Sequence, residues 1–267
     1  MASKSKRPKA LILVPHYFNG VSGAHVPFGS SDIENESIRK SQVESCQSAL
    51  NESFQALKIE YQIIKLGIKG SSLIDLDLEL KTENPRFLPW IAMDHANTLS
   101  PHFDFVMVIE DDIQINSITL EAIISFNSQD ESDSILIANR VEQILEEQFC
   151  TDLVAMPGWK SPAISLNGKS YREPINIHSG LLLLTSEKFR SAYTNRPFKE
   201  PTKIIGDYMA SAFANMHAYF KILRALPTSS EVTVLHLDSW VQRQMNNNLL
   251  EVDKFHEALK LQELESI

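Results

Sequence analysis

Apolar runs of strand length alternate with segments of helical spacing along most of the chain, and this alternation constrains the fold more than any other feature. The first run, "ALILVPHYF" (residues 10–18), is continuously apolar, as expected for a strand that is buried on both faces. Residues 34–58 place apolar side chains close to helical spacing, and "EYQIIKLGI" (residues 60–68) predicts a second strand. Strand, helix and strand at this spacing predict an α/β fold with a mostly parallel central sheet and helices on both faces.

The alternation continues towards the end of the chain. We expect further strands within residues 103–113, 132–142, 151–157 and 232–237, and a strand that runs into a helix over residues 175–189. Helices are expected over residues 87–100, 117–126, 141–149 and 206–220. Pro89 is tolerated in the first turn of one of these helices, and Ser117 is the expected cap of another. Ligands of such sheets bind beyond the carboxyl ends of the strands, so the segments that follow the first and third strands are candidate binding loops.

Length and composition are those of a globular protein with one large domain. The 267 residues are 43% hydrophobic and 22% charged, and no Pro-rich linker divides them. We expect a flexible basic tail over residues 1–9 and a C-terminal helix over residues 246–267. Between them we expect a single domain over residues 10–245, divided into a first half (10–116) and a second half (117–245). The formal net charge of −9 argues against nucleic acid as a partner.

The start of the chain and the cysteines favour a cytoplasmic protein. The apolar run from Ala10 to Val14 meets Pro15 and is too short for a signal peptide or a membrane span. Cys46 and Cys150 lie far apart in sequence, which favours reduced thiols. The lysines of the basic tail leave open a peripheral contact with the inner face of a membrane.

The stretch "FVMVIEDDIQI" (residues 105–115) ends a strongly apolar strand in three adjacent carboxylates, Glu110, Asp111 and Asp112. Burying unpaired carboxylates is costly, so a cation is expected beside them. Mg²⁺ and Mn²⁺ take oxygen ligands and share one or two carboxylates with substrate phosphates. In an extended chain, Glu110 and Asp112 would point to one side and Asp111 to the other. The alternative is an acidic turn that is solvated at the edge of the sheet.

Other nucleotide and catalytic motifs are absent from the sequence. No GxGxxG follows a strand and no GxxxxGK[ST] occurs, so Rossmann dinucleotide and P-loop sites are unsupported. The sequence also lacks GxSxG, HExxH and paired CxxC motifs, which excludes the common serine-hydrolase and zinc signatures.

Several segments together resemble the GT-A glycosyltransferases, in which a buried strand ends in a DxD-type motif and a helix follows. "FDFVMVIEDDIQINSITLEAI" (residues 103–123) resembles that strand and motif, and its Glu-Asp-Asp form is similar to the version in N-acetylglucosaminyltransferases of the Golgi. "LILVPHYF" (residues 11–18) is similar to the start of the first nucleotide-binding unit of family-2-like members. "IHSGLLLLTSEKF" (residues 177–189) resembles the acceptor-side strand and helix. The likeness spans roughly residues 10 to 240, with the segments in the order of the family. It implies a single catalytic domain with a nucleotide-sugar-binding half over residues 10–116 and an acceptor half over residues 117–245.

The resemblance implies roles for the three acids. Asp112 would be the main ligand of Mn²⁺ or Mg²⁺, Glu110 a second ligand, and Asp111 a contact to the ribose or sugar of the donor. His236 follows a late strand, where many members supply a third metal ligand, and Asp238 is the alternative if the register differs. A His in this position is also compatible with a hydrogen-bonded core residue.

The resemblance also implies a catalytic base. "IGDYMASAFANMHAYFKILRALP" (residues 205–227) resembles the segment where inverting members place an acid at the start of a helix. Asp207 would take the proton from the acceptor hydroxyl as that oxygen attacks the anomeric carbon. The family usually has two acids here, and this chain has Gly206 and Asp207. An acid favoured by the helix dipole alone is the structural alternative, and "HSGLLLL" leaves retention of configuration open.

Further contacts to the donor and acceptor follow from the same resemblance. Pro15 and His16 at the end of the first strand would lie in the nucleotide site. Asp77, or Asp75 in another register, would be the acid that contacts the nucleobase of the donor. Gly180 would let the acceptor approach the backbone closely, although a bulge explains a glycine there equally well.

The sequence thus predicts a metal-dependent glycosyltransferase for polysaccharide or glycoconjugate synthesis. It would move a sugar from a nucleotide-diphosphate donor to a hydroxyl of a saccharide or glycoconjugate acceptor, with inversion. Trp159 is a candidate platform on which the acceptor sugar would stack. For His178 the alternatives are those of His236, a metal ligand or a hydrogen-bonded core residue. One alternative is a sugar-nucleotide pyrophosphorylase, disfavoured because "VPHYFNGVSGAH" (residues 14–25) holds no Lys or Arg. The other is a non-catalytic binding or scaffold protein of the same fold, which the single acid at Asp207 would suit.

Overall fold

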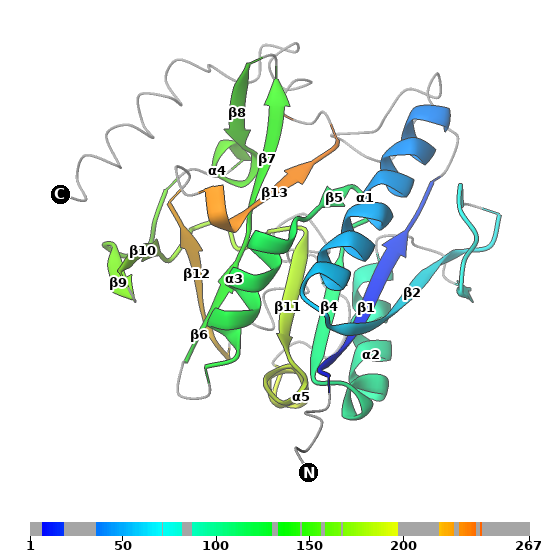
Figure 1. The fold of residues 1–267 in the computed structure, drawn as a ribbon, viewed down its shortest axis with the longest axis horizontal. Helices are drawn as coiled ribbons and strands as arrows, with labels where there is room; N and C mark the ends of the chain where they lie inside the picture. Colours follow the sequence, from blue (N-terminus) through cyan, green and yellow to red (C-terminus); the bar gives the residue numbers. More distant parts are fainter. Residues whose placement is uncertain are drawn as a thin grey trace.

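The computed structural model of the chain describes residues 7–18, 36–70, 72–81, 87–129, 133–144, 146–155, 158–166, 168–196, 219–226, 230–238 and 241. Within these residues, strands and helices form an α/β protein whose central strands are flanked by helices (Figure 1).

A five-stranded sheet forms the centre of the molecule, with its strands in the order β11-β4-β1-β2-β3. The strands are β1 (Lys9–His16), β2 (Glu60–Ile68), β3 (Leu78–Leu80), β4 (Phe105–Ile109) and β11 (Leu181–Thr185). All pairings are parallel except that of β11 with β4. This arrangement confirms the predicted mostly parallel sheet. Since β2 and β4 lie on opposite sides of β1, the strand order reverses between β1 and β4, where ligands of such sheets bind.

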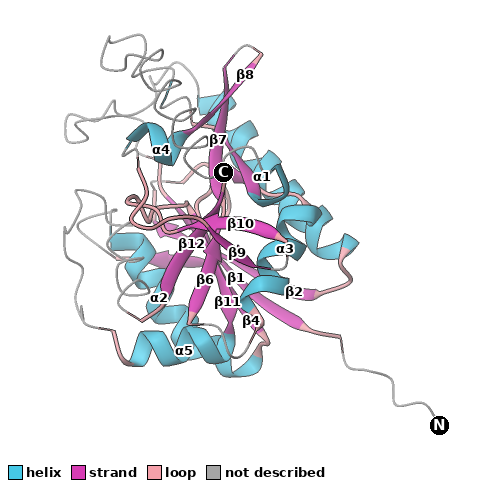
Figure 2. Cartoon of the chain, turned by 90° about the vertical axis from the view of Figure 1, so that its left-hand side faces the viewer, coloured by secondary structure: helices cyan, strands magenta, loops and turns pink. Residues whose placement is uncertain are grey.

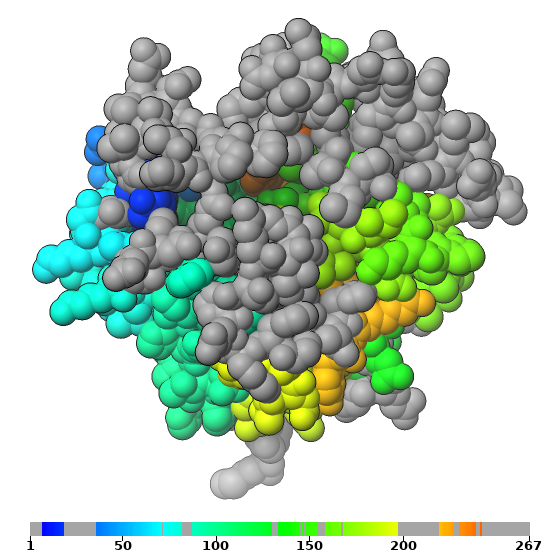
Figure 3. All heavy atoms as spheres, turned by 180° about the vertical axis from the view of Figure 1, so that it is seen from behind, coloured from blue at the N-terminus to red at the C-terminus, as the bar shows by residue number. Residues whose placement is uncertain are grey.

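Helices cover both faces of this sheet, as the alternating sequence pattern predicts. Figure 2 shows the strands between two pairs of helices, α1 (Glu36–Ala56) with α3 (Ser117–Asn127), and α2 (Leu88–Leu99) with α5 (Ser186–Thr194). Leu11 and Leu13 of β1 pack with α2 and α5, whereas Ala10, Ile12 and Val14 pack with α1 and α3. Figure 3, seen from behind, shows the teal residues of α2 and the yellow residues of α5, which cover the face opposite α1 and α3. Every side chain of this stretch of β1 is therefore buried in one of two cores.

Two smaller sheets complete the described part of the fold. One has the order β6-β12-β10-β9 and the other β5-β13-β7-β8. Their strands are β5 (Ile113–Gln114), β6 (Ser134–Ile137), β7 (Asn139–Ile144), β8 (Glu147–Cys150), β9 (Ile164–Leu166), β10 (Lys169–Arg172), β12 (Lys221–Ala225) and β13 (Thr233–His236). β5 follows the acidic triplet directly and pairs with β13. The late strand β13 is thereby brought to the end of β4.

The helices begin close to the predicted positions. Pro89 lies in the first turn of α2, as expected, and a 3-10 turn, η3 (Ser100–His102), follows that helix. The expected cap of α3 is wrong by one residue, because the side chain of Asn116, not Ser117, accepts the N–H of Thr119 at 2.9 Å. A second 3-10 turn, η4 (Ser230–Val232), leads into β13.

Two predicted elements are wrong. Residues 141–149, predicted as a helix, form the hairpin of β7 and β8, and residues 151–157, predicted as a strand, contain the helix α4 (Thr151–Ala155). Val141, Ile144 and Phe149 have helix-like spacing, and Glu and Gln are good helix formers. Pairing of β7 with both β13 and β8 overrides that propensity, since a strand here completes the third sheet.

Some predictions fall outside the described residues. These are residues 206–218 of the helix predicted over residues 206–220, the C-terminal helix over residues 246–267, and the first six residues of the basic tail. No helix among the described residues is long and apolar enough to cross a membrane.

Candidate active site

The acidic triplet and His16 meet at the point where the strand order reverses. β1 and β4 pair in parallel from Ala10 opposite Phe105 to Leu13 opposite Val108. Continuing this register by three residues places His16 opposite Asp111, and the two side chains are indeed hydrogen-bonded. The end of the third predicted strand is therefore the candidate binding edge of the sheet.

The three adjacent acids lie in three different surroundings. β4 ends at Ile109, and Asp111 and Asp112 form a turn in which the N–H of Ile113 donates to the carbonyl of Glu110 at 3.3 Å. The expectation that Glu110 and Asp112 share one side of an extended strand is wrong, because the strand does not continue through them. Each carboxylate instead has a different closest partner, although Arg39 lies beside both Asp111 and Asp112.

Asp111 is held by His16 and Arg39. The N–H of Leu73 donates to Nε2 of His16 at 3.1 Å, so this nitrogen accepts, and Nδ1 carries the proton donated to Asp111. Nη2 of Arg39, on α1, donates to Oδ1 of Asp111 at 2.6 Å. Burial alone would raise the pKa of Asp111, but Arg39 and His16 outweigh it and hold that pKa below its ordinary value. Asp111, the predicted donor contact, is thus an ionised carboxylate beside the first strand.

Glu110 is bound on the opposite side by His178 and Arg140. Nη1 of Arg140 donates to Oε2 at 3.2 Å, and Nε2 of His178 lies 3.1 Å from Oε1. Nδ1 of His178 is 3.1 Å from Nη2 of Arg140, which can only donate, so the proton of the neutral ring sits on Nε2 and points at Glu110. Gly180 has φ +65°, and a Cβ there would lie 2.7 Å from Oε2 of Glu110. The glycine therefore makes room for the chain's own ion pair.

A buried charge network supports Glu110 from behind. Asp152, on α4 and fully buried, accepts from Nε and Nη2 of Arg140 at 2.9 and 2.7 Å. Its other oxygen lies 2.9 Å from Nη1 of Arg224, on β12. Arg224 also donates to the backbone carbonyl of His178. Burial alone would raise the pKa of Asp152, but the two guanidinium groups outweigh burial and lower it.

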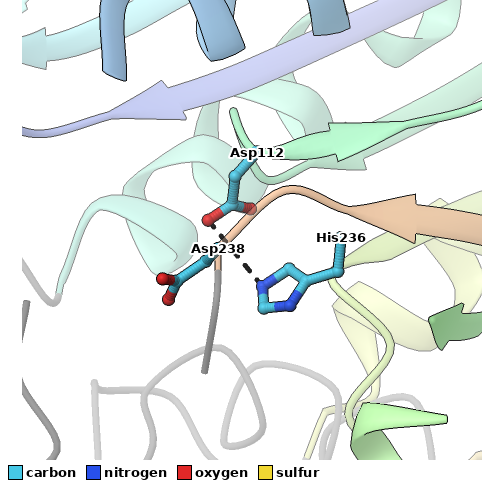
Figure 4. A group of neighbouring side chains, drawn as sticks. All are labelled: Asp112, His236 and Asp238. Carbon is cyan, nitrogen blue, oxygen red and sulfur yellow. Dashed lines mark ion pairs between the residues drawn. The ribbon is translucent and has the colours of Figure 1, made fainter. Parts of the chain in front are cut away.

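Asp112, His236 and Asp238 form a third cluster, drawn in Figure 4. Their potential ligand atoms all lie within 4.8 Å of one another, and Nε2 of His236 is 3.8 Å from Oδ2 of Asp112. The N–H of Leu237 donates to the carbonyl of Asp112 at 2.9 Å, which fixes the end of β13 against the turn. Two predicted ligands and the predicted alternative, Asp238, are thus brought together. Glu110, the other predicted ligand, is not in this group and is bound by Arg140 and His178 instead.

The carboxylate of Asp112 lacks the close partners that the other two acids have. Its Oδ1 is buried without a hydrogen-bond partner among the described residues, and Arg39 lies 3.6 Å from Oδ2. Burial raises the pKa of Asp112 to about 6, with Glu110 and Asp111 adding repulsion against the pull of His236 and Arg39. A buried, under-compensated carboxylate beside an imidazole and a second carboxylate is a donor set that fits a divalent cation.

Glu142 completes this cluster and was missed in the sequence. It lies on β7, and its Oε1 is 2.9 Å from Nδ1 of His236. Burial lowers the pKa of the His236 imidazole, but Glu142 and Asp112 outweigh it and raise that pKa above its ordinary value. A helix over residues 141–149, as predicted from the sequence, gives no reason to place Glu142 beside His236. An acid in line with the strand "SILIANRVE" (residues 134–142) was the available signal.

The remaining predicted site residues are placed as follows. Pro15 is the penultimate residue of β1. Oδ2 of Asp77 accepts the N–H of Lys65, on β2, at 2.8 Å. Trp159 is half-buried, packs on the small apolar cluster around Val141 and lies under the guanidinium of Arg172. Asp207, the predicted base, lies outside the described residues.

Comparisons with known proteins give likenesses of fold only. No protein-family model and no curated protein sequence matches the chain. Among solved structures, it is similar to a glycosyltransferase involved in the glycosylation of the major capsid of PBCV-1, with a TM-score of 0.40 and 11% identity over 91% of this chain and 100% of that one. It is also similar to the inositol-1-phosphate CTP transferase from T. maritima, with a TM-score of 0.41 and 12% identity over 95% of each chain.

A third similar structure is a 4-diphosphocytidyl-2C-methyl-D-erythritol synthase, with a TM-score of 0.41 and 9% identity over 89% of this chain and 98% of that one. Structures similar to this chain thus include a glycosyltransferase and nucleotidyltransferases. Because these TM-scores and identities are low, the function is inferred from the geometry of the site.

Proposed function

We propose that this protein is a metal-dependent glycosyltransferase that moves a sugar from a nucleotide-diphosphate donor to a hydroxyl of a saccharide or glycoconjugate. The observation that carries this proposal is the buried oxygen of Asp112, which lacks a hydrogen-bond partner among the described residues and lies beside His236 and Asp238. These three residues sit where the strand order of a mostly parallel sheet reverses, the ordinary place for a nucleotide ligand. The order of sequence segments that resembles GT-A enzymes gives independent support.

The charges around the triplet support Asp112 as the carboxylate that would bind a cation. Glu110 and Asp111 each accept a hydrogen bond from an arginine of the chain. Asp112 is 3.6 Å from Arg39 and 3.8 Å from His236, which exceeds hydrogen-bond distance. Its pKa of about 6 means that the protein alone stabilises its charge poorly. Such a carboxylate is better satisfied by Mn²⁺ or Mg²⁺ than by the groups around it.

Asp112, His236 and Asp238 would hold the metal. When bound, Mn²⁺ or Mg²⁺ supplies positive charge to neutralise the diphosphate leaving group. Asp111, fixed by His16 and Arg39, presents an ionised carboxylate that would orient a hydroxyl of the donor. We propose Asp207 as the base that takes the proton from the attacking acceptor hydroxyl, with inversion at the anomeric carbon.

Hydrolysis and transfer measured across a panel of nucleotide sugars, with and without Mn²⁺, test this function. We expect metal-dependent release of nucleotide diphosphate from at least one donor, and loss of that activity in Asp112→Asn. Glu121→Gln, an exposed acid on α3, is the matched control and should keep full activity. Full activity in Asp112→Asn would overturn the metal assignment. Formation of a sugar nucleotide from sugar phosphate and nucleoside triphosphate would instead indicate a pyrophosphorylase.

The base is tested separately from the metal. Asp207→Asn should lose sugar transfer while still binding donor, because the amide cannot accept the proton but leaves the diphosphate site intact. Calorimetry with uridine diphosphate and Mn²⁺ measures the binding, and product formation measures the transfer. Equal transfer rates in Asp207→Asn and the unmodified protein would remove Asp207 from the mechanism. Donor binding without turnover in the unmodified protein would favour the non-catalytic alternative.

A further inference from the structure

Glu142 contacts the part of the chain that supplies two of the three candidate ligands. β7 and β13 pair in parallel with Val141 opposite Leu235, so Glu142 is the neighbour of His236 one residue further along. The side chain of Glu142 is only 3% exposed. A buried carboxylate requires hydrogen-bond donors around it, and the donors to Glu142 come from the neighbourhood of the candidate ligands.

Each carboxylate oxygen of Glu142 has a distinct task. Oε1 lies 2.9 Å from Nδ1 of His236 and also accepts the hydroxyl of Thr151 at 3.4 Å. Oε2 accepts the backbone N–H of Val241 at 2.8 Å. One oxygen therefore orients the ring of His236, and the other binds the backbone N–H of Val241, three residues beyond Asp238.

The contact with His236 also determines which ring nitrogen carries the proton. A carboxylate can only accept, so Nδ1 is the N–H donor in this pair. Nε2 is the nitrogen that faces Asp112, and in the neutral ring it holds the lone pair. Carboxylates that orient a metal-binding histidine through its far nitrogen act in this way in many metal sites.

We propose that Glu142 is the positioning residue of the metal site: it holds His236 as the Nδ1–H tautomer, with Nε2 free to bind a divalent cation, and anchors the segment that carries Asp238. This inference rests on the proposed function, since it requires that Asp112, His236 and Asp238 bind a metal. Glu142 would act through His236 and would not itself be a ligand of the metal.

Mn²⁺ affinity in the absence of donor, measured by electron paramagnetic resonance of the free ion, tests the positioning role. In Glu142→Gln the side-chain carbonyl can accept from His236 or from Val241 but no longer pairs an oxygen with each. We expect a loss of about 10- to 100-fold in Mn²⁺ affinity, the usual cost of removing such a partner. Glu146→Gln, the same change at an exposed position of the β7–β8 hairpin, should bind Mn²⁺ as the unmodified protein does.

Nitrogen-15 NMR of the unmodified protein provides a test that does not depend on a variant folding. The signals of His236 are those lost in His236→Asn, and at a pH above the pKa of the ring they should show the proton on Nδ1. An Nε2–H tautomer, or unchanged Mn²⁺ affinity in a folded Glu142→Gln, would overturn the inference while leaving the proposed function intact. Absence of Mn²⁺ binding by the unmodified protein would overturn both.

Discussion

The three adjacent acids of the triplet have different closest partners, and each partner is distant in sequence. The turn after β4 sends Glu110 to Arg140, Asp111 to Arg39 and Asp112 towards His236. Carboxylates at the end of a strand made Asp112 a candidate cation ligand, and the resemblance to GT-A enzymes made His236 another. The structure brings the two side chains to 3.8 Å of each other, while their role as ligands stays a prediction. The sequence could not predict how the acids divide, because the partner of each acid comes from a different element of the fold.

Gly180 shows how the environment of Glu110 depends on a missing side chain. We expect Gly180→Ala to lower stability by about 2–4 kcal/mol, since an L-residue is strained at φ +65° and its Cβ would meet Glu110, Arg140 and Ile113 within 2.9 Å. The shift of the urea midpoint measures the loss. Gly168→Ala is the matched control, with φ +75° and open space around the Cβ, and should lose only about 1 kcal/mol. Equal losses in the two variants would show that the Glu110–Arg140 pair yields without cost.

At the scale of elements, the hairpin of β7 and β8 explains most of what the sequence interpretation missed. Read as a helix, residues 141–149 place Glu142 on a solvated surface, whereas the strand places it next to His236. The short run "TDLVA" (residues 151–155) cannot be assigned to strand or helix from periodicity. Its helix presents Asp152 to two arginines from other strands. Tertiary pairing, not local propensity, decides both segments.

The ion pairs of Asp152 join β7, α4 and β12, so this residue is expected to be among the most sensitive in the chain. Asp152→Asn removes the carboxylate that pairs with buried Arg224 and one of the two carboxylates that pair with Arg140, and we expect a loss of about 3–5 kcal/mol, measured by chemical denaturation at neutral pH. Asp94→Asn removes a largely exposed partner 4.0 Å from Arg196 and should cost about 1 kcal/mol or less. A small loss in Asp152→Asn would mean that water reaches the network.

The same residue predicts part of the acid sensitivity of the fold. The pKa of Asp152 is lower in the folded protein than its ordinary value, so its contribution to stability is fully present above that ordinary value, about 3.9. The contribution is lost as the pH falls through the lowered folded pKa. We therefore expect the stability of the unmodified protein to fall more steeply below about pH 4 than that of Asp152→Asn. Parallel pH profiles of the two proteins, measured by thermal unfolding, would contradict this assignment.

At the scale of the whole molecule, the central sheet was predictable and the site only in part. The continuous apolar run in β1 and the alternation with helices determine a parallel sheet buried on both faces, which the two cores confirm. The placement of β13 beside β5 is not encoded in local pattern, because the two strands are brought together by the pairing of Leu235 with Gln114. His236 therefore became a candidate through resemblance, and the proximity of Glu142 and Asp238 to it is seen only in three dimensions.

The two buried thiols allow the free energy of local opening to be compared between two parts of the molecule. Cys46, on α1, and Cys150, on β8, are both free and buried. Burial raises the pKa of Cys150 to about 11 and that of Cys46 further still, so neither thiol is reactive in the folded protein. Cys150 belongs to the small cluster of β7, β8 and α4, whereas α1 covers the central sheet. Small clusters open locally at lower free energy than the main core does.

We therefore expect Cys150 to be labelled before Cys46 in native buffer, through opening of the β7–β8 hairpin alone. Labelling rates of the single-thiol variants Cys46→Ala and Cys150→Ala, followed at increasing urea, measure the two opening free energies. The rate at Cys150 should depend weakly on urea, because little surface is exposed, and the rate at Cys46 should follow global unfolding. Both thiols should react equally once the protein is fully denatured. Identical native rates with identical urea dependence would mean that the hairpin and the central sheet unfold as one cooperative unit.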